Sequence, residues 1–148
     1  MKRTRILVVD DEVSFTRLLK LNLEQTDEYE VRIENRAEEA VAAARGFRPD
    51  LILLDIMMPR MVGSDVATQI REDAHLRSTP IVYLSAAVGG KWAKDNENTP
   101  GGLPFVAKPA SVEQVLAAIE QHLIPGPSAN QIAAASPAWP YENVASTN

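Results

Sequence analysis

The sequence predicts an α/β protein in which short strands alternate with helices around a parallel sheet. Three continuous apolar runs, at residues 6–9, 51–54 and 81–84, are too short for helices and contain no charged residue. Such runs are typical of strands that are buried on both faces. Apolar residues at helical spacing fill most of the chain between them. We therefore expect a doubly wound (βα)5 three-layer sandwich with the strand order 2-1-3-4-5.

The first half of the chain is expected to hold two strands and two helices. Residues 6–9 form the first strand. The helix after it is marked by three apolar residues, Phe15, Leu18 and Leu19. Apolar and charged residues alternate over residues 29–34, which predicts a half-exposed edge strand. The second helix carries alanines at helical spacing, with Asn35 predicted as its N-cap and Gly46 as its stop.

The second half is expected to continue the alternation. After the strand at residues 51–54, a helix is predicted from about residue 64 to residue 74, with Val66 and Ile70 facing the core. A weaker fifth strand is predicted at residues 105–107. The last helix begins with a capping box, Ser111-x-x-Gln114. Its buried face is expected to hold five apolar residues, Val112, Val115, Leu116, Ile119 and Leu123.

Two segments depart from this regular pattern. Residues 89–104 contain four glycines and two prolines, so we expect a short or irregular fourth helix there. Residues 125–148 hold four of the ten prolines and are rich in alanine and serine, which is typical of a disordered tail. We therefore expect a folded domain over residues 1–124 and a tail over residues 125–148.

Composition excludes several classes of protein. The chain has no cysteine, so disulfides, thiolate zinc sites and a catalytic thiol are excluded. The net charge of −5 argues against a nucleic-acid module, which needs a basic face. No apolar run reaches the roughly 18–20 residues of a membrane span, and the N-terminus does not resemble a signal peptide. We expect a cytoplasmic protein without direct nucleic-acid binding or membrane insertion.

Polar residues follow four of the five predicted strands. Asp10 and Asp11 follow the first strand, Asp55 the third, Ser85 the fourth and Lys108 the fifth. The carboxyl ends of these strands meet where the winding of the sheet reverses, so we expect the five side chains to share one crevice. Carboxylate oxygens suit Mg²⁺, which lets an anionic phosphoryl group approach a nucleophilic carboxylate. The set indicates phosphoryl transfer to an aspartate.

Four stretches carry a resemblance to a known family: ILVVDDE, DLILLDIMMPRMVG, PIVYLSA and FVAKP. In this order and at these strand ends, they resemble the receiver domain of a two-component response regulator over residues 4–124. The likeness is to single-domain, chemotaxis-regulator-like receivers with a flavodoxin-like fold. It implies that Asp55 is the phosphoacceptor. It also implies that Mg²⁺ is bound by Asp10, Asp11, Asp55 and the main-chain carbonyl of Met57.

The same resemblance implies how the site would switch. Ser85 would move its hydroxyl toward the phosphoryl group, and Lys108 would pair with its oxygens after pairing with Asp55 in the unphosphorylated state. Phe105 occupies the position of an aromatic switch residue. Pro59 and Gly63 match the loop after the acceptor, which needs a fixed turn and a small residue.

The resemblance further implies a signalling switch rather than a turnover enzyme. A histidine kinase or phosphotransfer protein would donate the phosphoryl group, and an unknown downstream protein would receive the signal. Three alternatives remain, and two of them would need other residues. An aspartate phosphatase generally has a second acidic residue where Met57 stands, and a flavodoxin-like nucleotide binder has a Ser/Thr/Gly-rich loop where residues 10–12 are acidic. The third alternative is an interaction module of the same fold that is not phosphorylated.

Overall fold

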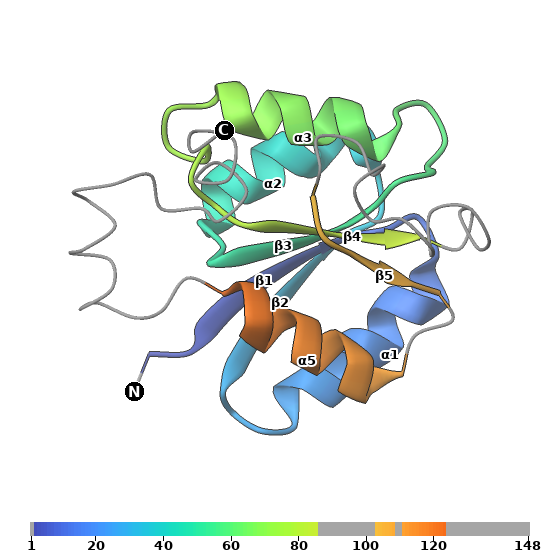
Figure 1. Cartoon of the computed structure of the whole chain (residues 1–148), viewed down its shortest axis with the longest axis vertical. Helices are drawn as coiled ribbons and strands as arrows, with labels where there is room; N and C mark the ends of the chain where they lie inside the picture. The colour runs from blue at the N-terminus through green and yellow to red at the C-terminus, as the bar shows by residue number, and fades with distance from the viewer. Residues whose placement is uncertain (1, 86–102, 109–110, 124–148) are drawn as a thin grey trace, which may run out of the picture.

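The computed structural model describes residues 2–85, 103–108 and 111–123, which form a five-stranded parallel sheet with helices on both faces (Figure 1). The strand order β2-β1-β3-β4-β5 confirms the predicted topology. The strands are β1 (Thr4–Val9), β2 (Tyr29–Glu34), β3 (Leu51–Asp55), β4 (Ile81–Ser85) and β5 (Phe105–Ala107). The helices are α1 (Val13–Glu24), α2 (Ala40–Phe47), α3 (Gly63–Glu72) and α5 (Val112–His122), and a short 3-10 turn, η1 (Ala37–Glu39), precedes α2.

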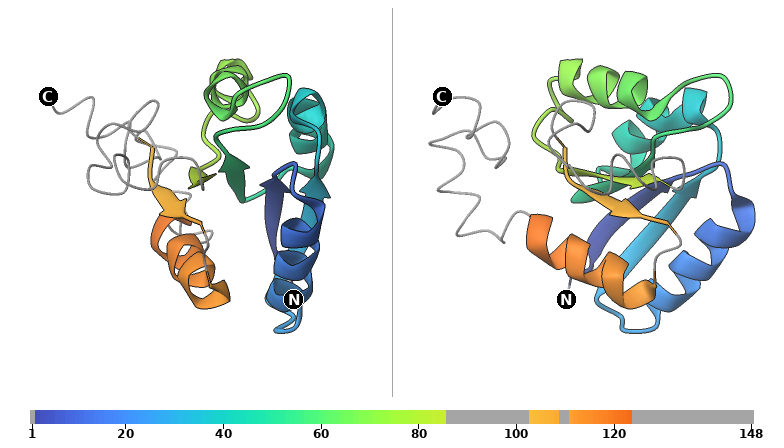
Figure 2. Two further views of the ribbon diagram at one scale, coloured as in Figure 1. Left: turned by 90° about the vertical axis from the view of Figure 1, so that its right-hand side faces the viewer. Right: turned by 45° about the vertical axis from the view of Figure 1, so that its right-hand side comes forward.

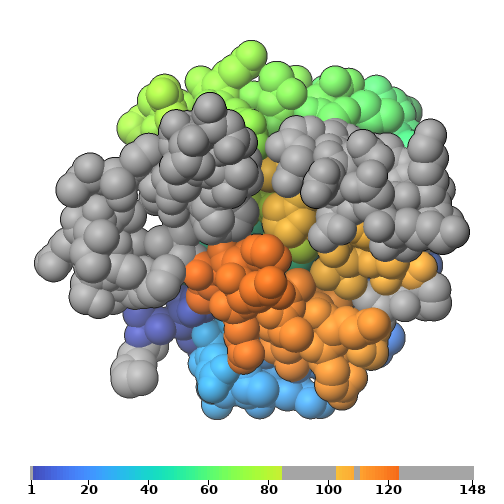
Figure 3. Space-filling model, in the orientation of Figure 1, coloured from blue at the N-terminus to red at the C-terminus, as the bar shows by residue number. Residues whose placement is uncertain are grey.

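Two hydrophobic cores lie on opposite faces of the sheet because successive strand side chains point to opposite sides. Ile6 and Val8 of β1 pack with apolar residues of α1 and α5, whereas Leu7 and Val9 pack with those of α2 and α3. The separation of the two helix pairs is visible in Figures 1 and 2. Figure 3 shows the surface of α5 lying against the light-blue surface near the end of α1. The fold is therefore the expected three-layer sandwich.

Several local predictions are confirmed. In β2, Tyr29 and Val31 are buried while Glu30 and Arg32 are exposed, as an edge strand requires. Val66 and Ile70 of α3 are fully buried. Among the described residues, no helix has the length and apolar character needed to cross a bilayer.

The capping box of α5 is also present. The Ser111 hydroxyl accepts a hydrogen bond from the backbone N–H of Gln114 at 3.1 Å. The Gln114 side chain in turn accepts one from the backbone N–H of Ser111 at 2.8 Å. Two otherwise unpaired donors of the helix N-terminus are thus satisfied.

Two predicted boundaries of α2 are wrong. The Asn35 side chain does not cap the helix, because it bonds instead to the backbone of the loop after β1. Gly46 does not end the helix, which continues to Phe47 and ends at Arg48, a residue in the left-handed conformation with φ of 56°. The backbone N–H of Arg48 reaches the Ala44 carbonyl at 2.8 Å, so the helix is closed without a glycine. Of the three apolar residues that predicted α1, Leu19 is buried and Leu18 is exposed.

The predicted irregular fourth helix falls mostly within residues 86–102, and the predicted tail falls within residues 124–148. Both segments lie outside the described residues.

Candidate functional site

Three aspartates come together at the carboxyl ends of β1 and β3. The parallel pairing of Val9 with Leu54 puts the residues that follow each strand at one edge of the sheet. One carboxylate oxygen from each of Asp10, Asp11 and Asp55 lies within 4.8 Å of the others. Asp10 and Asp55 are buried, whereas Asp11 is exposed. The cluster therefore concentrates negative charge at the rim of the core.

The electrostatic consequence is strongest at Asp55. Burial raises the pKa of its carboxyl to about 7, and the nearby Asp10 carboxylate acts in the same direction. Lys108 and a hydrogen bond from the backbone N–H of Met57 to Asp55 Oδ1, at 3.3 Å, oppose this rise. An ionised Asp55 therefore needs additional positive charge nearby.

The loop after β1 is held in place by hydrogen bonds to Asp10. The backbone N–H of Glu12 donates to Asp10 Oδ1 at 2.9 Å. The Asn35 amide donates to the Asp10 carbonyl at 2.7 Å and to the buried Thr16 hydroxyl at 3.0 Å. Sequence reasoning missed this role of Asn35, although its position directly after an adjacent strand was a signal for it.

Lys108 lies next to this loop, at the end of β5. Its ammonium contacts Asp10 Oδ2 at 2.5 Å and Glu12 Oε1 at 3.3 Å, and it sits 4.5 Å from the centre of the Phe15 ring. Burial alone would lower the pKa of Lys108, but the Asp10 carboxylate outweighs this effect and the pKa is raised. Within the described part of the chain, no ion pair joins Lys108 to Asp55. The expected pairing with Asp55 is thus replaced by pairing with Asp10 and Glu12.

The loop between Asp55 and α3 packs tightly under the acceptor. The backbone N–H of Gly63 donates to the Ile56 carbonyl at 2.6 Å. A Cβ atom at this position would lie 2.3 Å from the Asp55 carbonyl oxygen and 2.9 Å from Ile56 Cα. The expectation of a small residue at Gly63 is confirmed, and its reason is a close backbone approach. In the same loop Arg60 adopts a left-handed conformation with φ of 74°.

The remaining predicted residues are placed by the sheet. Ser85 is the last residue of β4, the strand next to that of the acceptor, and pairs in register with Ala107 of β5; its side chain lies outside the described residues. Phe105 begins β5, pairs in register with Tyr83 and is partly buried against the core that contains α2 and α3. Met57 is exposed, two residues after the acceptor.

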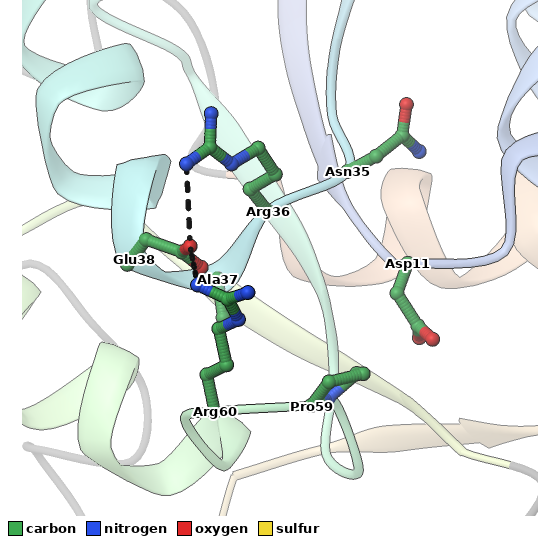
Figure 4. Close-up of a pocket in the computed structure, with 7 residues that line it drawn as sticks. All are labelled: Asp11, Asn35, Arg36, Ala37, Glu38, Pro59 and Arg60. Carbon is green, nitrogen blue, oxygen red and sulfur yellow. Dashed lines mark hydrogen bonds and ion pairs between the residues drawn. The ribbon is translucent and has the colours of Figure 1, made fainter.

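A pocket of about 320 Å³ adjoins the acidic cluster (Figure 4). Asp11 forms one wall, and the opposite wall is formed by Glu38 between the side chains of Arg36 and Arg60. The Arg36 and Arg60 guanidiniums both lie on Glu38 Oε2, at 3.4 and 3.6 Å. The sequence analysis assigned no functional role to these three residues.

Sequence comparison identifies relatives for most of the chain. A family model described as the response regulator receiver domain matches residues 6–120. The chain is 39% identical over 114 residues to the transcriptional regulatory protein ResD of Bacillus subtilis, which covers 76% of this chain and 45% of ResD. It is 33% identical over 134 residues to the response regulator ArlR of Staphylococcus saprophyticus, which covers 87% of this chain and 56% of ArlR. The chain thus spans about half the length of these relatives.

Structure comparison finds similar folds. The chemotaxis response regulator CheY4 of Vibrio cholerae matches with a TM-score of 0.70 and 28% identity, over 81% of this chain and 98% of CheY4. The receiver domain of a sensor histidine kinase from Pseudomonas aeruginosa matches with a TM-score of 0.67 and 22% identity, over 81% of this chain and 97% of that domain. That structure holds a magnesium ion coordinated in its active-site cleft.

Proposed function

The chain belongs to the response regulator receiver domain family, and from this we propose that it is a phosphorylation-activated switch whose phosphoacceptor is Asp55. The observation that carries the proposal is the grouping of three aspartate oxygens within 4.8 Å, with the Lys108 ammonium in contact with one of the three residues. Asp55 is the buried member of this group whose pKa is raised to about 7. We further propose that the receiver unit spans residues 1–124 and that residues 125–148 form a tail.

The donor set fits Mg²⁺. The three aspartates offer only oxygen ligands, which a hard divalent cation prefers, and their mutual repulsion falls when a cation joins them. Asp10, Asp11, Asp55 and the main-chain carbonyl of Met57 would hold the ion, as the family resemblance implies. Bound there, Mg²⁺ would supply the positive charge that lets phosphoryl oxygens approach the carboxylates.

The transfer step assigns a role to each residue. A carboxylate oxygen of Asp55 would form a bond to the phosphorus of a phosphohistidine, and the P–N bond would break with its electron pair going to the imidazole nitrogen. The phosphoryl group brings roughly −1.5 to −2 charges. That charge would draw Lys108 away from Asp10 and Glu12. Ser85, at the end of β4, and Phe105, at the start of β5, would respond as switch residues.

The partners follow from the family. Receiver domains are signalling domains, so we propose that a histidine kinase or phosphotransfer protein donates the phosphoryl group in the cytoplasm. The signal would pass to another protein, since the acidic net charge of −5 does not favour direct contact with nucleic acid. ResD is a transcriptional regulatory protein, so output to transcription is one class of response to which this switch could be coupled.

The test is the intact mass of the protein after incubation with Mg²⁺ and a small acyl phosphate. We expect one added phosphoryl group on the wild type, and none on Asp55→Asn or without Mg²⁺. The isosteric asparagine keeps the volume of the acceptor and removes its nucleophilic charge. If no group is added although Mg²⁺ binding is measured by calorimetry, the domain is a receiver-fold interaction module that is not phosphorylated.

A further inference from the structure

The pocket beside the acidic cluster carries two arginines on the wall that faces Asp11. Asp11 is common to both, so the pocket opens directly beside the phosphoacceptor crevice. On the far wall, two guanidinium groups share one oxygen of Glu38 (Figure 4). One carboxylate cannot neutralise two arginines, and each guanidinium carries five N–H donors. The far wall therefore has a net positive charge and spare hydrogen-bonding capacity.

Both arginines are attached to segments that build the phosphoacceptor site. Arg36 directly follows Asn35, whose side-chain amide donates a hydrogen bond to the Asp10 carbonyl at 2.7 Å. Arg60 lies in the loop between Asp55 and Gly63, and its left-handed φ of 74° is unusual for a residue with a Cβ atom. The backbone of both arginines is thus placed relative to the acceptor, while their side chains stay 65% and 77% exposed. A small anion from solvent can reach both groups.

We propose that this pocket is an anion subsite, which takes the carboxylate leaving group of small acyl-phosphate donors. The inference rests on the proposed function of Asp55. An oxygen of Asp55 forms a bond to phosphorus, and the bond between phosphorus and the acyl oxygen breaks with its electron pair on that oxygen. The products are the aspartyl phosphate and a free carboxylate. Planar guanidiniums bind carboxylates in two-pronged geometry, so Arg36 and Arg60 stabilise the negative charge that develops on the leaving oxygen.

Glu38 occupies the same donors before the substrate arrives. Its contacts to the two arginines, at 3.4 and 3.6 Å, are longer than a strong charge-assisted hydrogen bond of about 2.7–2.9 Å. An incoming carboxylate therefore competes with a loosely held partner. Glu38 acts as an internal substitute for the leaving group, and its removal should make both arginines more available.

The test compares two phosphodonors that differ in their leaving group. Acetyl phosphate releases a carboxylate, whereas phosphoramidate releases neutral ammonia and has no use for an anion subsite. We expect Arg36→Gln and Arg60→Gln each to slow phosphorylation by acetyl phosphate roughly fivefold, as expected for the loss of an exposed charged hydrogen bond. The rates with phosphoramidate should change less than twofold. Glu38→Gln should raise the acetyl phosphate rate and leave the phosphoramidate rate unchanged.

Arg45→Gln is the matched control. Arg45 is 64% exposed and pairs with Asp73 at 2.6 Å, away from the pocket, so its removal changes the net charge equally without touching the subsite. Equal slowing with both donors, or slowing by Arg45→Gln as well, would show general attraction of anions and overturn the inference. No effect of Arg36→Gln and Arg60→Gln would overturn it too. If the wild type accepts phosphate from neither donor, the proposed function itself fails and the subsite with it.

Discussion

Replacing Gly63 with alanine is expected to destabilise the domain, because the added methyl group would collide with backbone rather than with a movable side chain. The new Cβ would lie 2.3 Å from the Asp55 carbonyl oxygen, about 1.1 Å closer than an ordinary contact of at least 3.4 Å. Such overpacking costs roughly 3 kcal/mol, since the loop and the end of β3 must both shift. Alanine recovers about 0.5–1 kcal/mol through lower entropy of the unfolded chain. The net loss is therefore roughly 2 kcal/mol, or about 6–10 °C in Tm for a domain of this size.

The measurement is equilibrium urea denaturation of the variant and of a matched control, Gly46→Ala. At Gly46, within α2, a Cβ would meet only Arg32 Nη1 at 3.8 Å, which is an ordinary contact. The control should gain about 0.5–1 kcal/mol, because alanine is the better helix former. Phosphorylation of Gly63→Ala should also be slower, since the clash lies against the acceptor residue itself. If Gly63→Ala is as stable as Gly46→Ala, the argument from close backbone approach is wrong.

Three further outcomes are expected. Because the pKa of Asp55 is raised from 3.8 to about 7, the folded state keeps a proton that the unfolded state loses near pH 4. Without Mg²⁺, the unfolding free energy should therefore fall as pH rises from about 4 to about 7, and Asp55→Asn should abolish this part of the slope in urea titrations. Lys108→Met leaves the carboxylate of Asp10 buried without its cation, so we expect the free energy of unfolding to fall by about 3 kcal/mol. Mg²⁺ should then stabilise this variant more than it stabilises the wild type, and equal Mg²⁺ effects on both proteins would contradict the reasoning. Ser111→Ala removes the capping hydroxyl and should cost about 1 kcal/mol, with faster amide exchange in the first turn of α5 and unchanged exchange in α1.

Patterns within short windows predicted most of the fold correctly. The run at residues 51–54 is fully buried in β3, as its lack of charged residues indicated. The alternation around Val31 predicted an edge strand, and β2 is one. The rule that parallel strands end at one edge was sufficient to bring Asp10 near Asp55 without any knowledge of side-chain contacts. These features depend on residues that are adjacent in sequence or on the order of the strands.

The errors lie where a residue had a choice of partners. Asn35 has the chemistry of a helix cap, but it bonds to the backbone of Asp10, 25 positions away. Arg48 is not a typical residue for the left-handed end of a helix, yet it takes that conformation, whereas the sequence pattern favoured a helix end at Gly46. In both cases contacts with the rest of the fold outweighed a local preference that is worth about 1 kcal/mol or less.

The sequence by itself determined the strand order, the buried strands and the set of acidic and basic residues at the strand ends. These features depend on apolar patterns within short segments and on the order of those segments along the chain. Only the tertiary structure decided how those charges pair. Lys108 pairs with Glu12, 96 positions away in the sequence, and Arg36 and Arg60 both contact the carboxylate of Glu38. Charged side chains are long and have several partners of similar energy, so the partner is selected by the distances that the folded backbone imposes and not by any local pattern.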